Sequence, residues 1–105
     1  DADILAATKY IYRNYKKPLT LAEVSAQAAL SPTYFSKKFK QITGMGFKEY
    51  LNFVRLRHAQ TALLTTSSTI TDIALENGFN DSNYFKDLFK KVYGKSPREY
   101  RRNQG

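Results

Sequence analysis

The sequence contains one segment twice, and this repeat constrains the fold more than any other feature. Placing residues 34–50 over residues 84–100 gives seven identities in 17 positions, whereas average residue usage would give about one. The identical pairs are Tyr34/Tyr84, Phe35/Phe85, Phe39/Phe89, Lys40/Lys90, Gly44/Gly94, Glu49/Glu99 and Tyr50/Tyr100. Upstream the offset changes from 50 to 49 and pairs Thr20 with Thr69. Two copies are too few for a solenoid, so the chain is predicted to be a duplicated module.

The few Pro and Gly residues lie between segments with helical periodicity. Hydrophobic spacing and capping residues predict helices over about 3–15, 20–28, 31–44 and 47–64, and further helices that start at Thr69, Asp81 and Ser96. Thr20 with Glu23, and Thr69 with Asp72, are predicted capping boxes. The fold class is therefore all-α, with seven helices that form two helix-turn-helix units joined by a long central helix. We expect one DNA-binding domain over residues 1–105. Its first helix-turn-helix unit spans about 3–45, the linking helix about 46–65, and the second unit about 69–103.

The charge balance points to a polyanionic partner. The chain has 17 Lys and Arg against 9 Asp and Glu, a formal net charge of +8, no Cys and one His. Without Cys there is no zinc-thiolate site or disulfide, and no apolar run approaches the roughly 20 residues that span a membrane. We therefore expect no metal, cofactor or membrane association, and a cytoplasmic location. The chain begins at Asp1 rather than Met, so we expect a fragment of a longer protein.

Each copy has a short capped helix, a turn and a second helix, which is the layout of a DNA-binding helix-turn-helix. At 100° per residue, the second helices turn one apolar side inward: Phe35, Phe39 and Ile42 in the first copy, and Phe85, Leu88, Phe89 and Val92 in the second. The outward side differs between copies, with Thr33, Lys37, Lys40 and Gln41 against Asn83, Asp87, Lys90 and Lys91. This pattern favours two readers of different DNA sequences, although a structural duplication with a drifting surface predicts the same pattern.

The expected DNA contacts follow from side-chain chemistry. The residues expected to read base edges in the major groove of double-stranded DNA are Thr33, Ser36, Lys37, Asn83, Lys86 and Asp87. The residues expected at phosphates are Ser31, Lys40, Gln41, Lys90, Lys91 and Arg101. A linking helix over 47–64 would be ~27 Å long, and successive major-groove faces lie ~34 Å apart, so one chain could place two readers about one turn apart. Tyr34 and Tyr84 lie at the edge of both faces and receive no role.

The chain resembles the C-terminal DNA-binding domain of the AraC/XylS-type bacterial transcription regulators. The second half carries the most specific stretch, IALENGFNDSNYFKDLFKKVYGKSPREYRR, and the first half carries LSPTYFSKKFKQITG followed by FVRLRHAQTALL. The resemblance covers essentially the whole chain. It implies seven helices, two reading helices in adjacent major-groove segments, and regulation of transcription. An activator is expected, although the sequence itself does not give the sign of regulation. The resemblance also implies an effector or signalling domain elsewhere on the polypeptide, and RNA polymerase is a further candidate partner.

Two positions depart from the family pattern. Asp87 stands where the family's second reading helix often has a basic residue, so a guanine contact is not expected there. The alternatives are that its carboxylate accepts a hydrogen bond from cytosine N4, or that it is a surface residue without a DNA contact. Ala29 stands where the second copy has Gly78. This predicts that the first turn does not need a left-handed residue.

Two other classes of function remain as alternatives. An enzyme is not expected, because His58 is the only His and no clustered carboxylates accompany it. A helical module that binds RNA or another protein could use the same basic faces. RNA readers usually display aromatic platforms, whereas most Phe residues here lie on the predicted inner faces. Competition between duplex DNA and RNA of matched length would separate these functions.

Overall fold

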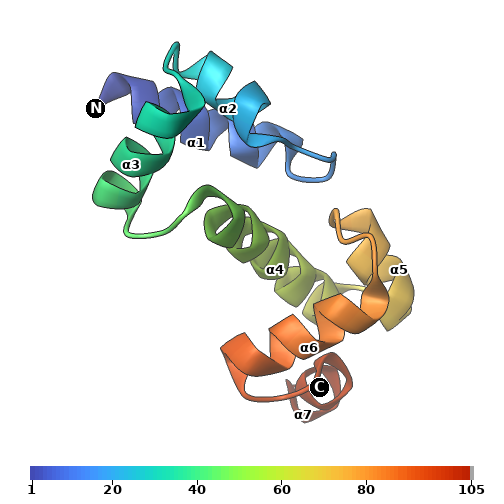
Figure 1. Ribbon diagram of the computed structural model, residues 1–105. Helices are drawn as coiled ribbons and strands as arrows, with labels where there is room; N and C mark the ends of the chain where they lie inside the picture. The colour runs from blue at the N-terminus through green and yellow to red at the C-terminus, as the bar shows by residue number, and fades with distance from the viewer. Residues whose placement is uncertain (105) are drawn as a thin grey trace. The chain divides into compact units, whose positions relative to one another are not determined.

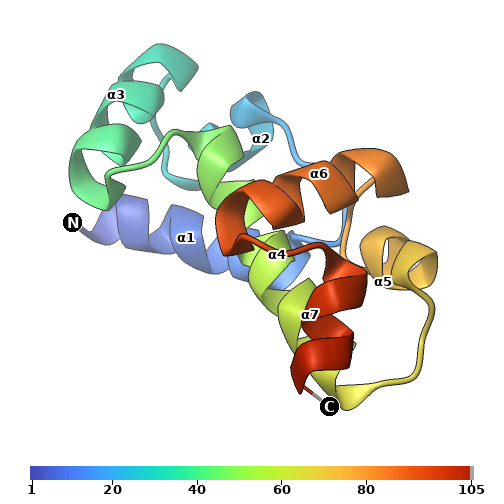
Figure 2. The same cartoon turned by 90° about the horizontal axis from the view of Figure 1, so that it is seen from below.

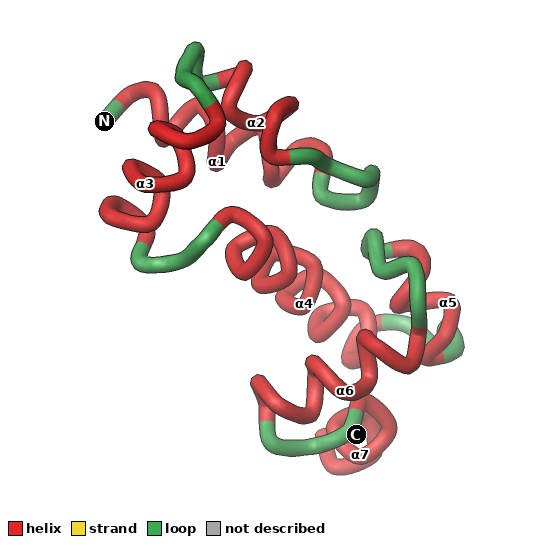
Figure 3. Tube along the Cα trace, in the orientation of Figure 1, coloured by secondary structure: helices red, strands yellow, loops and turns green. Residues whose placement is uncertain are grey.

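The chain folds into helices throughout the part that the structure describes. The structure is a computed structural model and describes residues 1–104, in which there are seven helices and no strand. The helices are α1 (Ala2–Asn14), α2 (Leu21–Gln27), α3 (Pro32–Thr43), α4 (Phe47–Thr65), α5 (Ile70–Glu76), α6 (Ser82–Tyr93) and α7 (Pro97–Gln104) (Figures 1 and 3). The prediction of an all-α fold with seven helices is confirmed. The chain divides into two compact units, 1–54 and 55–105, and the boundary lies within α4.

Side chains cap the helices where the sequence predicts caps. The hydroxyls of Thr20 and Thr69 each accept a hydrogen bond of 3.1 Å from the backbone N–H three residues later. Ser96 and Glu99 form a complete capping box, with both reciprocal hydrogen bonds at 3.1 Å, and these bonds hold the pKa of Glu99 below its ordinary value. Glu23 differs from the prediction, because its carboxylate accepts a 3.0 Å hydrogen bond from the hydroxyl of Tyr10 on α1 instead.

Unit 1 encloses a core between α1, α2, α3 and the first half of α4. Its fully buried side chains include Ile4, Ala7 and Ile11 from α1, Val24 from α2, Phe35 and Phe39 from α3, and Leu51 and Val54 from α4. The ring of Tyr50 meets that of Phe39 edge to face at 5.2 Å, a favourable geometry for aromatic pairs. Two residues of the predicted apolar face of α3, Phe35 and Phe39, are therefore buried in this core.

Unit 2 repeats this arrangement with the second half of α4 in the place of α1. Leu56, Ala59 and Leu63 are buried at the same i, i+3, i+7 spacing as Ile4, Ala7 and Ile11, and they pack with residues of α5, the following turn and α6. Helix α7 lies beside this half of α4 (Figure 2), where the amide of Gln60 donates to the Tyr100 hydroxyl at 2.6 Å. The helix expected only to link the units thus contributes a wall to each core.

The turn after α2 corrects the expectation for Ala29. Ala29 has φ 56°, in the left-handed region, and its counterpart Gly78 has φ 96°. In both turns the backbone closes a Schellman motif, with a 3.1 Å bond from Leu30 N–H to Ser25 O in unit 1 and a 3.0 Å bond from Phe79 N–H to Ala74 O in unit 2. Because this motif requires the left-handed residue, Ala29 adopts a conformation that costs an L-residue about 1–2 kcal/mol.

Candidate nucleic-acid interface

Helix α3 presents a polar face on the side opposite its buried Phe residues. Phe35 and Phe39 are 0% exposed, whereas Thr33, Lys37, Lys40 and Gln41 are exposed. The hydroxyl of Ser31 accepts the N–H of Tyr34 at 3.3 Å and begins the helix. A hydroxyl that accepts this bond still has its own proton to donate. The exposed residues of α3 therefore form one continuous face that begins at the N-terminus of the helix.

Ser36 lies away from the centre of this face. It is half-buried and borders an open groove of about 550 Å³ in unit 1, which it shares with Thr20 at the start of α2 and with Lys48 and Glu49 at the start of α4. On the helical wheel Ser36 is 100° from Lys37, toward Phe39. The structure therefore places Ser36 on the flank of α3 rather than beside Lys37 on its outermost side.

Helix α6 presents the corresponding face in unit 2. Phe85 and Phe89 are 0% exposed and Leu88 packs partly buried against the same core. The carboxylate of Asp81 accepts the N–H of Asn83 at 2.8 Å and begins the helix. The exposed side chains of α6 include all five residues expected at DNA: Asn83, Lys86, Asp87, Lys90 and Lys91.

Two residues predicted on the inner faces are exposed instead. Ile42 is 46% exposed and its repeat counterpart Val92 is 50% exposed. Ile42 lies on the last turn of α3 and borders an open groove with Leu5 of α1, which is itself 55% exposed. The prediction of an inward position is therefore wrong for the last turn of each helix, although Phe35, Phe39, Phe85 and Phe89 are buried as predicted.

Arg101 is held within unit 2 by three backbone carbonyls. Its guanidinium donates to the carbonyl of Leu63 at 3.0 Å, to that of Ser68 at 2.7 Å and to that of Thr66 at 3.1 Å. These acceptors lie at the C-terminal end of α4 and in the loop after it, where helix carbonyls lack intrahelical partners and favour a cation. The structure therefore gives Arg101 a capping position, and because a guanidinium has five N–H donors, its expected contact with a phosphate stays a prediction.

Lys38 is a further lysine of α3 that is engaged inside its unit. Its ammonium donates to Asp3 of α1 at 2.7 Å, and each side chain is about a quarter exposed. This hydrogen bond lowers the pKa of Asp3 and raises the pKa of Lys38. The pair fastens α3 to α1 and leaves Lys37, one position earlier, on the outer face.

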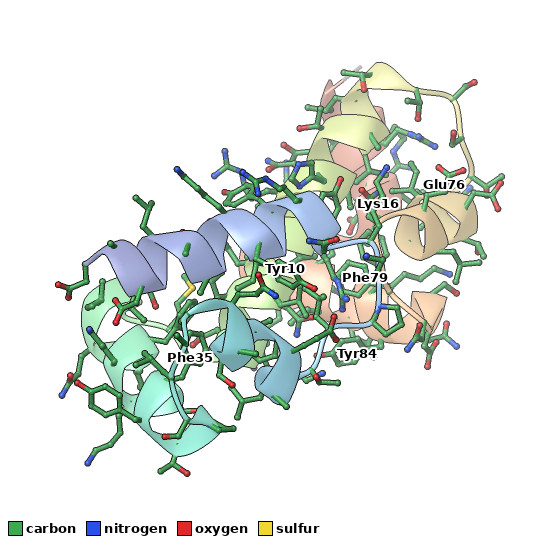
Figure 4. The ribbon with its side chains drawn as sticks, turned by 90° about the horizontal axis from the view of Figure 1, so that it is seen from above. Tyr10, Lys16, Phe35, Glu76, Phe79 and Tyr84 are labelled. Atoms are coloured by element: carbon green, nitrogen blue, oxygen red, sulfur yellow. The ribbon has the colours of Figure 1, made fainter. Side chains whose placement is uncertain are left out.

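The repeated tyrosines lie at the N-terminal ends of α3 and α6. Tyr34 is 54% exposed and Tyr84 is 51% exposed. Figure 4 shows the Tyr84 ring beside Phe79 of the preceding turn, and their centroids are 6.4 Å apart. Both tyrosines therefore border the polar faces without belonging to either core.

The structure also bears on metal and membrane association. Within residues 1–104, no group of three or more His, Cys, Asp or Glu side chains could hold a metal ion. No helix in the same part of the chain has the length and apolar character of a membrane span.

The comparisons with known proteins connect this geometry to regulators of transcription. A model of the helix-turn-helix domain family matches residues 24–103. A Staphylococcus aureus protein described as an uncharacterized HTH-type transcriptional regulator, SAS0078, is 40% identical over 92 residues, which are 88% of this chain and 12% of that protein. The chain thus spans only a small part of this curated relative.

Solved structures share the fold along almost the whole chain. The C-terminal domain of AraT, a response regulator from Geobacillus stearothermophilus, superposes with a TM-score of 0.92 at 35% identity, over 98% of this chain and 86% of that chain. A Chromobacterium violaceum regulator described as containing an AraC-type DNA-binding domain has a TM-score of 0.92 at 25% identity, over 99% and 93%. The DNA-binding domain of AdpA, solved with a target DNA, has a TM-score of 0.90 at 22% identity, over 95% and 90%, and shares the fold.

Proposed function

Because the chain belongs to the AraC-type helix-turn-helix domains, the DNA-binding domains of transcription regulators, we propose that it recognises double-stranded DNA with α3 and α6 as two separate reading helices. Each helix enters one segment of the major groove, and the two segments follow one another along the duplex. The target is consequently an asymmetric sequence of about two helical turns.

The observation that carries this proposal is the contrast between the two sides of each reading helix. The buried pairs Phe35/Phe39 and Phe85/Phe89 are identical between the units. The exposed residues Thr33 and Lys37 of unit 1 correspond to different residues, Asn83 and Asp87, in unit 2. A repeated core supports the same helix position in each unit, while different exposed groups supply different hydrogen-bonding patterns for base edges.

Each residue expected at DNA receives a role that suits its chemistry. Asn83 suits an adenine edge and Lys37 a guanine edge, each worth ~1–3 kcal/mol of discrimination. Asp87 accepts from cytosine N4, and Thr33, Ser36 and Lys86 complete the base-reading set. The phosphate contacts are those whose side chains remain exposed on the two faces: Ser31, Lys40, Gln41, Lys90 and Lys91. Arg101 completes this set, because its three hydrogen bonds to carbonyls use only three of the five N–H donors of the guanidinium.

The domain is proposed to act as part of a longer cytoplasmic regulator. The small share of the Staphylococcus aureus relative that it matches supports a larger protein with an effector or signalling domain, and the description of AraT as a response regulator supports a signalling input. RNA polymerase is the partner that transcription activation would require.

Selection of bound sequences from random duplex DNA tests the proposal. We expect one asymmetric consensus of about two helical turns, and binding that weakens steeply with salt. If about six phosphates are neutralised, log K against log salt has a slope near −5. Duplex RNA of matched length should compete poorly, whereas equal competition would favour the RNA-binding alternative. A palindromic best site for one chain, or a flat salt response, would exclude the two-reader mechanism.

A further inference from the structure

Helix α1 carries cations on the side away from its buried residues. The helix packs into the core of unit 1 through Ile4, Ala7 and Ile11. Lys9 and Arg13 are exposed and, at 100° per residue, lie on the opposite side of the helix. Because residues four positions apart are neighbours on a helix surface, the two side chains form one cationic row.

The carboxylates of α1 and α2 have other partners. Asp3 accepts a hydrogen bond from Lys38 at 2.7 Å, and Glu23 accepts one from Tyr10 at 3.0 Å. The sequence has no acidic residue between Asp3 and Glu23. The cationic row therefore gives this side of unit 1 a positive charge.

The packing of the helix does not require these cations. The second half of α4 takes the place of α1 in unit 2, and the offset of 52 that superposes their buried residues pairs Lys9 with Thr61 and Arg13 with Thr65. Both threonines are helical and exposed. A helix with the same buried spacing thus carries neutral residues at the same two positions, so the charges of Lys9 and Arg13 have no role in the core.

An apolar groove adjoins one end of the cationic row. Leu5, one helical turn before Lys9, is 55% exposed, and Ile42 of α3 is 46% exposed. Together with Thr8 they border the open groove of about 540 Å³ at the start of α1 and the end of α3. Apolar surface rimmed by polar residues is typical of sites at which proteins bind one another.

This surface faces away from the DNA that α3 is proposed to read. Helices α2 and α3 lie on one side of α1 (Figures 2 and 4), and the buried sides of α1 and α3 meet in the core of unit 1. The exposed face of α3 and the cationic row of α1 therefore point away from this core on different sides. A phosphate backbone also offers nothing apolar to Leu5 and Ile42, so an acidic protein fits the surface better than a nucleic acid does.

We propose that the outer side of α1 binds an acidic helix of a partner protein while α3 and α6 hold the DNA. Carboxylates spaced four residues apart on that helix pair with Lys9 and Arg13. An apolar side chain beside them enters the groove between Leu5 and Ile42. Docking of an amphipathic helix into a groove is a recurring mode of recognition between proteins. The surface adds a protein partner to the proposed function, because reading DNA requires none of these four residues.

The probe is a synthetic helical peptide of about 20 residues, long enough to form a helix alone. It has a Glu at every fourth position along one side and a Leu at one end of that row. A second peptide has Lys in place of each Glu. Each peptide is titrated into the isotope-labelled protein, and binding is followed by the chemical shifts of the backbone amides. The Glu peptide should shift the amides of α1 and of the end of α3, with and without the selected duplex, and the Lys peptide should shift neither.

The variants follow from the repeat. Lys9→Thr combined with Arg13→Thr copies the residues of unit 2 and should weaken binding of the Glu peptide about 2- to 30-fold, the combined effect of two exposed ion pairs. Lys9→Glu combined with Arg13→Glu should reverse the preference, so that the Lys peptide binds, and this gain also shows that the variant is folded. Lys95→Glu combined with Arg102→Glu changes the net charge equally at exposed residues of unit 2 and should leave the preference unchanged. Leu5→Ala should weaken binding of the Glu peptide without altering its salt dependence.

The outcomes separate this inference from the proposed function. Equal binding of the two peptides, or the same loss from the variant of Lys95 and Arg102, would overturn it, because net charge alone would then explain the binding. If the threonine variant makes the slope of log K against log salt for the duplex shallower by ~0.9 for each cation removed, α1 contacts phosphates and the inference is wrong. If the unaltered protein binds the Glu peptide through α1 but binds no duplex, the proposed function fails and the protein-binding surface stands.

Discussion

Replacing Ala29 with Gly should stabilise the protein. Ala29 has φ 56° because the N–H groups of Ala29 and Leu30 close the end of α2 on the carbonyls of Ala26 and Ser25. Relief of the left-handed conformation gains about 1–2 kcal/mol, and the greater freedom of Gly in the unfolded chain costs about 0.4–1 kcal/mol. The methyl group is exposed, so no core contact is lost. The free energy of unfolding should therefore rise by about 0.8 kcal/mol.

Thermal unfolding followed by circular dichroism measures this change. For a domain of about 100 residues, 1 kcal/mol shifts Tm by roughly 4–8 °C, so Ala29→Gly should raise Tm by about 3–6 °C. Gly94→Ala is the matched control for the opposite substitution. Gly94 has φ +79°, and a Cβ added there meets nothing within 4 Å, so this variant should lose about as much as Ala29→Gly gains.

The two variants together make the reasoning refutable. If Ala29→Gly lowers Tm while Gly94→Ala lowers it as well, the left-handed strain at Ala29 is absent and the turn has another conformation. If Gly94→Ala has no effect, the left-handed penalty is smaller than assumed and the explanation for Ala29 is wrong in magnitude.

Three further predictions concern the cores, the reading helices and the hydrogen bonds of Arg101 at the end of α4. Phe39→Ala and Phe89→Ala should each lower the free energy of unfolding by ~3–5 kcal/mol, because both rings are fully buried; a negligible change in urea denaturation would contradict the assigned cores. Asn83→Ala should relax preference at one base pair, whereas Lys40→Ala should weaken binding to all sequences and reduce the salt slope by ~1; titration of single-base variants distinguishes the two, and a uniform loss for Asn83→Ala would reject its reading role. Arg101→Gln should lower Tm, because it leaves carbonyls at the end of α4 unpaired; an unchanged Tm would contradict this capping role.

Local signals in the sequence were sufficient to predict the helices and the residues at which they begin. Ser31, Asp81 and Ser96 begin helices as predicted, because a side-chain cap acts within three residues and is visible in the sequence. The buried pairs Phe35/Phe39 and Phe85/Phe89 were predicted for a similar reason, since helical periodicity fixes the direction of each side chain.

The errors arose where the deciding partner is distant or belongs to the backbone. Ile42 and Val92 have the helical period of the inner faces but are about half exposed, because periodicity gives the direction of a side chain and not whether another element covers it. The sequence reasoning missed the capping bonds of Arg101, because their carbonyl acceptors lie 33–38 residues earlier and leave no trace in the residue pattern. Ala29 occupies a left-handed position that the residue type argues against. The roles of individual residues at DNA stay predictions.

The double use of α4 sets a limit on how this protein can be divided. A cut between Val54 and Arg55 would leave eight residues of the helix on one piece and eleven on the other, and helices shorter than ~12–15 residues are marginal alone. Pieces that each keep a complete set of walls, 1–65 and 47–105, must both carry α4. The two modules therefore overlap in the gene that encodes them, and recombination could exchange one only by copying the helix that it shares with the other.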